Sequence, residues 1–549
     1  MNQNSLLSVA FPTLDESQIA QLAKCAGPAP KSFRDGQTLF AVGERNINFF
    51  IVKSGEVEIV DDSGDERKTV AIHHPGEFTG DISHLTGLPA VVSAIARGDC
   101  EVYEITGDSL RKVLNQCPGT SDLILQAFIA RRQLLRESPN FTGLRVIGSR
   151  YSADTFRVRD FLSKNRILFT WLDVETDPNV DRVLRQFGMT ESDTPVVACG
   201  SMLLLRNPSN RQLADAIGIH QPLADQVYDL VVVGAGPAGL AASVYGASEG
   251  LRTALLEHTA PGGQAGASMR IENYLGFPTG LTGSELAGRA ILQVNKFGAH
   301  LSVPTLVDRL AFENAYTLVH LDGGETVTAK CLLIATGADY RRLGVEGSER
   351  FEGTGVYYAA TLAEGQLCHG SQVIVVGGGN SAGQAAVFLA GHARQVLLLI
   401  RGGDLYKNMS SYLVRRIEQT ANIELLCNTT IRAMNGNGHL ASVDLVNGKT
   451  NDSRTVETPG VFSFIGAEPR TAWLPPEIER DEKGFVRTGA DLARSPHWVS
   501  ARQPFLLETS RAGVFAAGDV RSGSVKRVAS AVGEGAMAVQ FVHEHLKSM

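Results

Sequence analysis

One continuous stretch, Asp229–Glu257, constrains the fold of this chain more than any other feature of its sequence. It reads DLVVVGAGPAGLAASVYGASEGLRTALLE and predicts a buried strand at Leu230–Val233, a glycine turn, a helix at Leu240–Ser248 and a second strand at Thr253–Leu256. These elements, in this order and within about 30 residues, are typical of a unit that binds a dinucleotide. The stretch therefore predicts a parallel α/β sheet and a nucleotide ligand.

The glycine turn and the end of the second strand supply the candidate contacts, which are Gly234, Gly236, Pro237, Ala238, Gly239 and Glu257. In the frame G-x-G-x-x-G, Gly234 permits the tight turn and Gly236 lets the backbone approach a pyrophosphate. Gly239 lets helix and strand pack closely, and the helix N-terminus offers amides to the phosphates. Glu257, 23 residues after Gly234, can accept hydrogen bonds from a ribose diol.

A second unit of the same kind lies at Gln372–Arg401, QVIVVGGGNSAGQAAVFLAGHARQVLLLIR. Its candidate contacts are Gly377, Gly379, Asn380, Ser381 and Ala382, in the frame G-x-G-x-x-A, and Arg401, 24 residues after Gly377. No acid ends this second strand, whereas Arg401 can meet a 2′-phosphate, which favours NADPH. Asp404 lies three residues further on, so NADH stays the alternative.

Two further short apolar strands end in glycine turns, at Leu332–Gly337 and at Gly513–Asp519. The two dinucleotide units stand about 140 residues apart, and this order fits a flavin domain interrupted by a nicotinamide domain. Asp519 can hydrogen-bond hydroxyl groups of the flavin. We therefore expect a chain that binds both FAD and NADPH.

Over residues 226–549 the chain resembles the low-molecular-weight thioredoxin reductases. The pieces that carry the resemblance are Gly262-Gly263-Gln264, Glu272-Asn273, Ala335-Thr336-Gly337, Gly518-Asp519 and Arg527-Val528-Ala529. The resemblance implies that these pieces contact FAD, with the last triplet against the isoalloxazine ring. It also implies an FAD domain split into residues 226–340 and 460–549 around an NADPH domain at 341–459, a homodimer, and hydride transfer from NADPH to flavin N5.

The redox C-x-x-C of that family, which precedes the second glycine motif, has no counterpart here. The corresponding segment, Val356–Glu364, contains no cysteine, and Cys368 stands alone beside the next strand, as expected of a core thiol. We expect electrons to leave for an acceptor other than an intrachain disulfide, such as a ferredoxin-like protein, a quinone or a partner's disulfide. No side-chain acid or base is identified as catalytic.

Two alternatives stay open. One is a thioredoxin-disulfide reductase that uses an external or partner disulfide. The other is a non-catalytic flavin or nucleotide redox sensor, whose state is read by the N-terminal modules. Turnover separates them, because an enzyme cycles NADPH with an acceptor and a sensor reduces once and stops.

Residues 1–140 predict many short strands followed by helices, a small β-barrel with helices. The sequences FRDGQTLFAVGERNINFFIVKSGEVEIV and PGEFTGDISHLTGLPAVVSAIA resemble the cyclic-nucleotide-binding domain family. Asp81 stands where the resemblance implies a ribose-binding Glu, and Ala90 where it implies a phosphate-binding Arg. A cyclic phosphate without that Arg loses a charge-assisted contact, so we favour a regulatory or packing module over a cyclic-nucleotide sensor.

Residues 141–220 predict the element order β-α-β-α-β-β-α, which resembles the thioredoxin and glutaredoxin family. Ser152–Thr155 occupies the place of the family's C-x-x-C, and Thr194-Pro195 matches its threonine–cis-proline. Without thiolates at the helix N-terminus this module cannot exchange disulfides. Ser152 and Thr155 are expected to cap the helix; a docking surface along the Pro195 edge is the alternative.

The whole chain therefore predicts an α/β flavoprotein with two dinucleotide-binding domains, preceded by a β-barrel-plus-helices module and a small thioredoxin-like α/β module. Of its 549 residues 43% are hydrophobic and 20% are charged, and the formal charge of −7 argues against nucleic-acid binding. Leu230–Ser248 carries no charge, but its glycine register favours a buried strand and helix over a membrane span. The seven cysteines, which suit a reduced cytoplasm and give no metal-binding or redox pair, are Cys25, Cys100, Cys117, Cys199, Cys331, Cys368 and Cys427.

Overall fold

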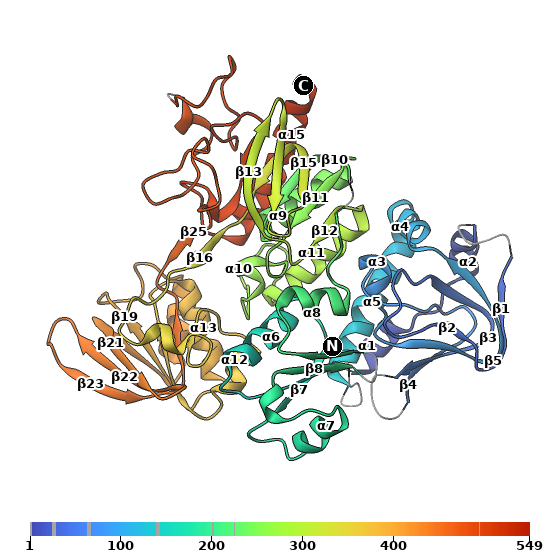
Figure 1. Ribbon diagram of the computed structural model, residues 1–549, viewed down its shortest axis with the longest axis horizontal. Coiled ribbons are helices and arrows are strands. Elements are labelled where there is room, and N and C mark those ends of the chain that lie inside the picture. The colour runs from blue at the N-terminus through green and yellow to red at the C-terminus, as the bar shows by residue number, and fades with distance from the viewer. Residues whose placement is uncertain are drawn as a thin grey trace. The chain divides into compact units, whose positions relative to one another are not determined.

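The computed structural model describes residues 3–24, 29–62, 67–138, 143–199, 203–223, 225–493 and 495–549, and Cys25 and Met202 lie outside these ranges. Figure 1 shows the order of the elements along the chain. The chain divides into two compact units. The N-terminal unit comprises 1–148, 166–222 and 292–303, and the C-terminal unit comprises 149–165, 223–291 and 304–549.

The N-terminal unit begins with an antiparallel sheet of five strands in the order β1-β5-β3-β4, with β2 beside β5 (Figure 1). The strands are β1 (Lys31–Phe33), β2 (Thr38–Phe40), β3 (Phe49–Asp61), β4 (Lys68–His73) and β5 (Ser93–Ile105). The helices are α1 (Gln3–Ala10), α2 (Glu16–Ala23), α3 (Ser83–Thr86), α4 (Gly107–Gln116) and α5 (Pro118–Glu137). The buried rings of Phe49, Phe78 and Phe128 join the strands to α5. The predicted β-barrel-plus-helices module is confirmed.

The same unit contains a second, four-stranded sheet in the order β7-β6-β8-β9. Its strands are β6 (Leu144–Gly148), β7 (Phe169–Asp173), β8 (Val196–Cys199) and β9 (Leu203–Arg206), and its helices are α7 (Val180–Gln186), η1 (Glu191–Asp193) and α8 (Asn210–Ile217). β6 and β7 are parallel and β8 is antiparallel to both of its neighbours. The peptide bond Thr194–Pro195 is cis. Along the chain these strands and helices, with the helix at Ala153–Lys164, follow the predicted element order β-α-β-α-β-β-α.

Residues 292–303, which include the end of α11 (Gly283–Phe297) and β12 (His300–Ser302), also belong to the N-terminal unit. Leu292 packs in the core beneath the first sheet, and the Lys296 ammonium donates to the Ser121 hydroxyl at 3.2 Å. The sequence contains no signal for this packing.

The C-terminal unit holds the two predicted dinucleotide folds. In the first, strands run in the order β11-β10-β15-β14-β13, with β26 beside β15. The strands are β10 (Val227–Val233), β11 (Thr253–Leu256), β13 (Val307–Glu313), β14 (Tyr316–Leu321), β15 (Thr326–Ile334) and β26 (Val514–Ala516). The helices are α9 (Pro237–Ser248), α10 (Gly263–Gly266), η3 (Gly489–Leu492), η4 (Gly518–Val520) and α15 (Val528–Ser548). β10 pairs in parallel with β11 and β15, as the glycine motif predicts.

The second fold is a parallel sheet in the order β17-β24-β18-β19-β20, with a three-stranded sheet β21-β22-β23. The strands are β17 (Val356–Tyr357), β18 (Gln372–Val376), β19 (Gln395–Ile400), β20 (Ile423–Cys427), β21 (Thr429–Gly436), β22 (Leu440–Asn447), β23 (Ser453–Glu457) and β24 (Val461–Ser463). The helices are η2 (Ser348–Phe351), α12 (Leu362–Leu367), α13 (Asn380–Ala390) and α14 (Ser411–Gln419).

The two folds are joined by a pair of short antiparallel strands, β16 (Ala338–Tyr340) and β25 (Ala467–Pro469). β24 lies in the second sheet, so the predicted boundary at residue 460 falls too early, and we place it between β24 and β25. Within the described residues, no helix combines the length and the apolar character needed to span a membrane.

Candidate functional site

The first glycine motif forms an open helix N-terminus at α9. Gly236 caps α9 without any side-chain hydrogen bond, and a Cβ on Gly236 would meet nothing closer than the Gly263 Cα at 4.0 Å. Gly234 has φ +103°, and a Cβ there would lie 2.4 Å from the Ala335 carbonyl oxygen. An uncapped helix N-terminus beside a partly exposed glycine backbone fits a pyrophosphate.

The other flavin candidates converge on this helix end. The Gly262 amide donates to the Ala235 carbonyl at 2.8 Å, which places Gly263 and Gln264 beside the motif. A Cβ on Gly518 would lie 3.0 Å from the Ala238 Cβ. Pro237 opens α9, and a Cβ on Gly239 would lie 1.8 Å from the Gly234 carbonyl oxygen, so this contact requires glycine.

The remaining candidates differ in exposure. Thr336 and Gly337 turn at the end of β15, where the Thr336 hydroxyl donates to the Arg470 carbonyl at 2.9 Å. Asn273 is exposed on the loop after Ile271. Arg527 caps α15 without a side-chain hydrogen bond and is followed by Val528 and Ala529 in its first turn. The second FAD segment thus also contains a helix, α15, whose N-terminus is not capped by a side chain.

Glu257 has partners that its sequence position did not predict. Its carboxylate is buried and accepts from the backbone amides of Ala235 at 2.7 Å, Thr259 at 2.9 Å and Ala260 at 3.3 Å. Glu257 therefore fixes the glycine turn against the end of β11. Two carboxylate oxygens offer about four acceptor positions, so a ribose hydroxyl can still be accepted.

Asp519, which we expected to meet the flavin, lies in η4 beside this helix end. Burial, the largest effect, and the neighbouring Glu534 raise the pKa of Asp519, whereas Lys526 lowers it. The Lys526 ammonium donates to the Asp519 backbone carbonyl at 2.5 Å. The carboxyl group is thus held in a partly buried position.

The second glycine motif forms an equivalent opening at α13. Gly379 caps α13 without a side-chain hydrogen bond, and a Cβ on Gly379 would meet nothing within 4 Å. Gly377 has φ +142° and lies against the Phe464 carbonyl oxygen, while Ala382 is buried beneath the motif. The Asn380 side-chain oxygen accepts from the Ser410 amide at 2.7 Å. Arg401 directly follows β19 and is exposed, so its guanidinium is available to a phosphate.

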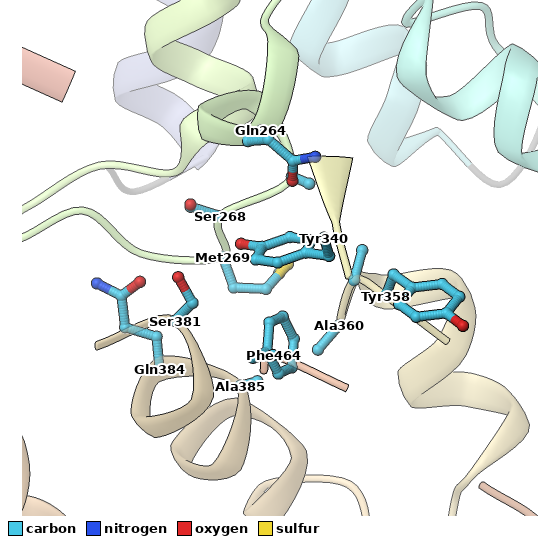
Figure 2. Close-up of a pocket in the computed structure, with 12 residues that line it drawn as sticks. Gln264, Ser268, Met269, Tyr340, Tyr358, Ala360, Ser381, Gln384, Ala385 and Phe464 are labelled. Atoms are coloured by element: carbon cyan, nitrogen blue, oxygen red, sulfur yellow. The ribbon is translucent and has the colours of Figure 1, made fainter. Parts of the chain in front are cut away.

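One pocket in the C-terminal unit is lined from both dinucleotide folds. Its lining residues are Gln264, Ala267, Ser268, Met269, Tyr340, Tyr358, Ala359, Ala360, Ser381, Gln384, Ala385 and Phe464. Figure 2 shows Tyr340 at its centre, between Gln264 of α10 and Ser381 of α13. Burial raises the pKa of Tyr340, and a hydrogen bond with Ser381 opposes this. None of the twelve residues is charged.

The pocket is also lined by part of Val356–Glu364, the segment at which the resemblance implies a redox pair. Tyr358, Ala359 and Ala360 of Val356–Glu364 line it and contribute no thiol. Cys368 is only 1% exposed within the core of the second fold, and burial raises its pKa to about 12. A thiol of this kind is inert at neutral pH, which supports the expectation that Cys368 is a core residue.

Sequence reasoning predicted Gln264 and Ser381 but missed Tyr340, Met269 and Phe464. Tyr340 follows the predicted Gly337 turn by three residues, and that position was a usable signal. Nothing in the sequence places Met269 or Phe464 in the pocket.

Residues 228–535 match the model of the pyridine nucleotide-disulphide oxidoreductase family. The chain belongs to this family. Residues 30–117 match the model of the cyclic nucleotide-binding domain, as the sequence resemblance implied. By this membership the chain is an NAD(P)H-dependent flavoprotein oxidoreductase, and its cofactors are FAD and NADPH.

Relatives and solved structures agree with this assignment. The thioredoxin reductase of Bacillus subtilis is 31% identical over 326 residues, which cover 59% of this chain and 96% of the relative. The thioredoxin reductase of Treponema pallidum is 32% identical over 329 residues, which cover 59% of this chain and 98% of the relative. The crystal structure of T. acidophilum thioredoxin reductase matches with a TM-score of 0.52 at 30% identity. The match covers 58% of this chain and 99% of that structure. The crystal structure of Lactococcus lactis thioredoxin reductase matches with a TM-score of 0.53 at 27% identity. The match covers 59% of this chain and 100% of that structure.

Proposed function

We infer that this protein is an NADPH-dependent flavoprotein reductase that delivers electrons to an acceptor other than an intrachain disulfide. The observation that carries this inference is the absence of a thiol from Tyr358–Ala360, the part of the redox-pair segment that lines the pocket. Cys368 does not replace the pair, because it is buried in the core. When bound, FAD supplies the chemistry that takes a hydride from NADPH and returns two electrons to an acceptor.

The protein's own residues bind and orient the two nucleotides. The open N-terminus of α9 suits the FAD pyrophosphate, and that of α13 suits the NADPH pyrophosphate. Arg401 is positioned for the 2′-phosphate. Tyr340, Gln264 and Ser381 line the pocket at which both folds meet. The assembly is a homodimer in this proposal, as the family resemblance implies.

A second candidate is reduction of a thioredoxin disulfide supplied by a partner. It is favoured by the relatives, which are thioredoxin reductases matched over nearly their whole length. This candidate requires a dithiol from outside the chain, because Val356–Glu364 holds none.

Anaerobic mixing of the purified protein with NADPH tests the proposal. Bleaching of the flavin band is expected to be faster with NADPH than with NADH. Reoxidation by a quinone or a ferredoxin, but not by oxidised thioredoxin, supports the non-disulfide reductase. Reoxidation by thioredoxin alone supports the second candidate. A protein that is reduced once and has no competent acceptor is a sensor, and a protein without flavin overturns the proposal.

A further inference from the structure

Helix α6 (Ala153–Lys164) belongs in sequence to the thioredoxin-like module but packs in the C-terminal unit. It begins at Ser152–Thr155, the place at which the resemblance to thioredoxins and glutaredoxins implies two cysteines. Here the Ser152 hydroxyl oxygen accepts from the Thr155 amide at 3.2 Å, so the helix N-terminus is capped by its own chain. α6 is therefore free of redox chemistry and has become a packing element.

Aromatic contacts join α6 to the second dinucleotide fold. Phe156 packs against the core of that fold, with its ring centroid 5.7 Å from that of Tyr357. A Cβ on Gly353 would lie 3.3 Å from the Phe156 ring, so this ring packs against the Gly353 backbone. Tyr151 lies against His439, with 4.7 Å between ring centroids. α6 thus covers the start of the segment that has lost its redox pair.

The contact continues to the end of that segment. Glu364 is 2% exposed and accepts from the Thr361 amide at 2.7 Å and from the Thr361 hydroxyl. Burial raises the pKa of Glu364, and the charge of Asp160 on α6 raises it further. The Asp160 carboxylate is paired with the Lys164 ammonium at 2.7 Å. The Lys164 ammonium thus offsets the charge of Asp160 where α6 packs beside Glu364.

The far end of α6 is tied to the first dinucleotide fold. The Asn165 side-chain amide donates to the Thr259 carbonyl at 3.0 Å and to the Phe161 carbonyl at 2.9 Å. Thr259 lies two residues after Glu257. The helix therefore contacts both folds.

The segment has a second side. Tyr357 contacts α6, whereas the next residue, Tyr358, lines the pocket and donates its hydroxyl to Glu352 at 3.0 Å. Three of the twelve side chains that line the pocket are aromatic and none is charged, and the rings of Tyr340 and Phe464 lie 5.3 Å apart between centroids. A lining without charge favours an uncharged acceptor, such as a quinone, over a charged one.

We propose that α6 covers one side of residues 353–364, keeps a folded disulfide protein away from that side, and so restricts the electron acceptor to small molecules such as quinones. The proposal rests on the reductase function inferred above. A quinone takes the hydride equivalent of NADPH, two electrons and one proton, and a second proton from water, which gives NADP⁺ and the hydroquinone. A folded disulfide protein cannot reach the segment while α6 covers it.

Amide hydrogen exchange of the full-length protein tests whether α6 covers residues 353–364. The amides of 353–368 are expected to exchange at least tenfold faster in Phe156→Asp than in the wild type, and Phe156→Leu is expected to keep them protected. Phe187→Asp is the matched control, because Phe187 packs in the core beside β8 and not against the second fold. Equal exchange in the wild type and Phe156→Asp overturns the cover.

A disulfide cross-link that holds α6, together with a comparison of acceptors, tests whether this helix restricts the electron acceptor. The double variant Tyr151→Cys/His439→Cys, with its disulfide verified by mass spectrometry, holds α6 in place. Turnover of NADPH with menadione is expected to stay within twofold of the wild type in the cross-linked form. Loss of menadione turnover on cross-linking overturns the proposal, because α6 would then have to leave. Wild-type turnover of oxidised thioredoxin at the menadione rate overturns it as well.

The two proposals fail in different ways. If NADPH does not reduce the flavin of the wild type, the reductase function fails, whereas the exchange experiment still reports on the cover.

Discussion

We expect a single side chain, that of Arg401, to decide the choice between NADPH and NADH. Replacing it with Ala removes the charge-assisted contact to a 2′-phosphate, which we expect to raise KM for NADPH about tenfold, equivalent to about 1.4 kcal/mol. KM for NADH is expected to stay unchanged. Steady-state kinetics with both nucleotides measure this difference.

Arg394 provides the matched control, because it is exposed at the opposite end of β19. Arg394→Ala is expected to leave both KM values unchanged. An equal rise for NADPH and NADH in Arg401→Ala would show that Arg401 does not read the phosphate.

Substitution of Cys368 tests whether its thiol is structural or takes part in redox chemistry. Cys368→Ser is expected to leave kcat unchanged and to lower the free energy of unfolding by roughly 1–3 kcal/mol, because it buries a hydroxyl without an assured partner. Cys368→Ala keeps the site apolar and is expected to cost less. Thermal unfolding and menadione turnover give the two readings, and a loss of turnover in both variants would identify a thiol relay.

In the segment that resembles the cyclic-nucleotide cassette, polar groups are paired with the chain's own residues. Arg132 pairs with Asp81 at 3.0 Å, and the other Asp81 oxygen accepts from the Ser83 amide at 2.9 Å. The Gln221 side chain donates to the Thr86 carbonyl at 2.7 Å. We therefore expect millimolar cyclic AMP to leave the melting temperature unchanged, and a rise of several degrees would contradict this.

The same pair has a stability consequence. Arg132→Ala leaves the buried Asp81 without its cation, and we expect a loss of roughly 3–5 kcal/mol in the free energy of unfolding. The double variant Asp81→Ala/Arg132→Ala is expected to recover much of that loss. Denaturant unfolding of the single and double variants measures the coupling, and additive effects would show that the pair is not coupled.

His73 makes the first sheet sensitive to acid. Burial lowers the pKa of His73 to about 4 from 6.5; Arg131 also lowers it and the Glu77 carboxylate at 3.4 Å opposes this. Because the folded-state pKa is depressed, the stabilisation by neutral His73 is complete above pH 6.5 and is lost as pH falls toward 4. At pH 5 about 2 kcal/mol is expected to be lost.

His73→Phe is expected to remove that part of the pH dependence. His74→Phe is the control, since His74 is exposed. Unfolding measured at pH 7.5 and pH 5 gives the comparison, and identical pH dependence in the wild type and His73→Phe would contradict the assignment.

Most elements could be predicted from the sequence because local patterns specify them. β11 has the predicted bounds, Thr253–Leu256. α9 begins earlier than predicted, at Pro237, because proline is favoured in the first turn of a helix. The glycine positions could be predicted because backbone contacts of 1.8–2.4 Å to a Cβ leave no other residue at Gly234 and Gly239.

The missed features depend on contacts between segments far apart in the chain. The three residues of β24 carry no signal for which of two sheets they join. The packing of Phe156 against Tyr357 spans about 200 residues and has no local pattern. Glu257 was predicted at the right place, but its three backbone partners follow only from the tertiary structure of the turn.

At the level of the whole C-terminal unit, one ion pair connects the loop beside the first fold to α14 of the second. The Arg416 guanidinium meets the Glu272 carboxylate at 2.7 Å and 3.3 Å, and Arg270 approaches the same carboxylate at 3.2 Å. The pair is partly exposed, so it contributes at most about 1 kcal/mol and is screened by salt. We expect this pair to favour the arrangement in which both folds line one pocket.

Weakening this pair is therefore expected to slow flavin reduction. A loss of about 1 kcal/mol lowers the population of the arrangement about fivefold, so Arg416→Met should slow anaerobic bleaching by NADPH three- to fivefold at low salt. Arg415→Met, at an exposed neighbouring position, should change nothing. The exchange Glu272→Arg/Arg416→Glu should restore the rate. At 1 M salt, where the screening length is about 3 Å, wild type and Arg416→Met should converge; a difference that persists there would mean that Arg416 acts through packing and not through its charge.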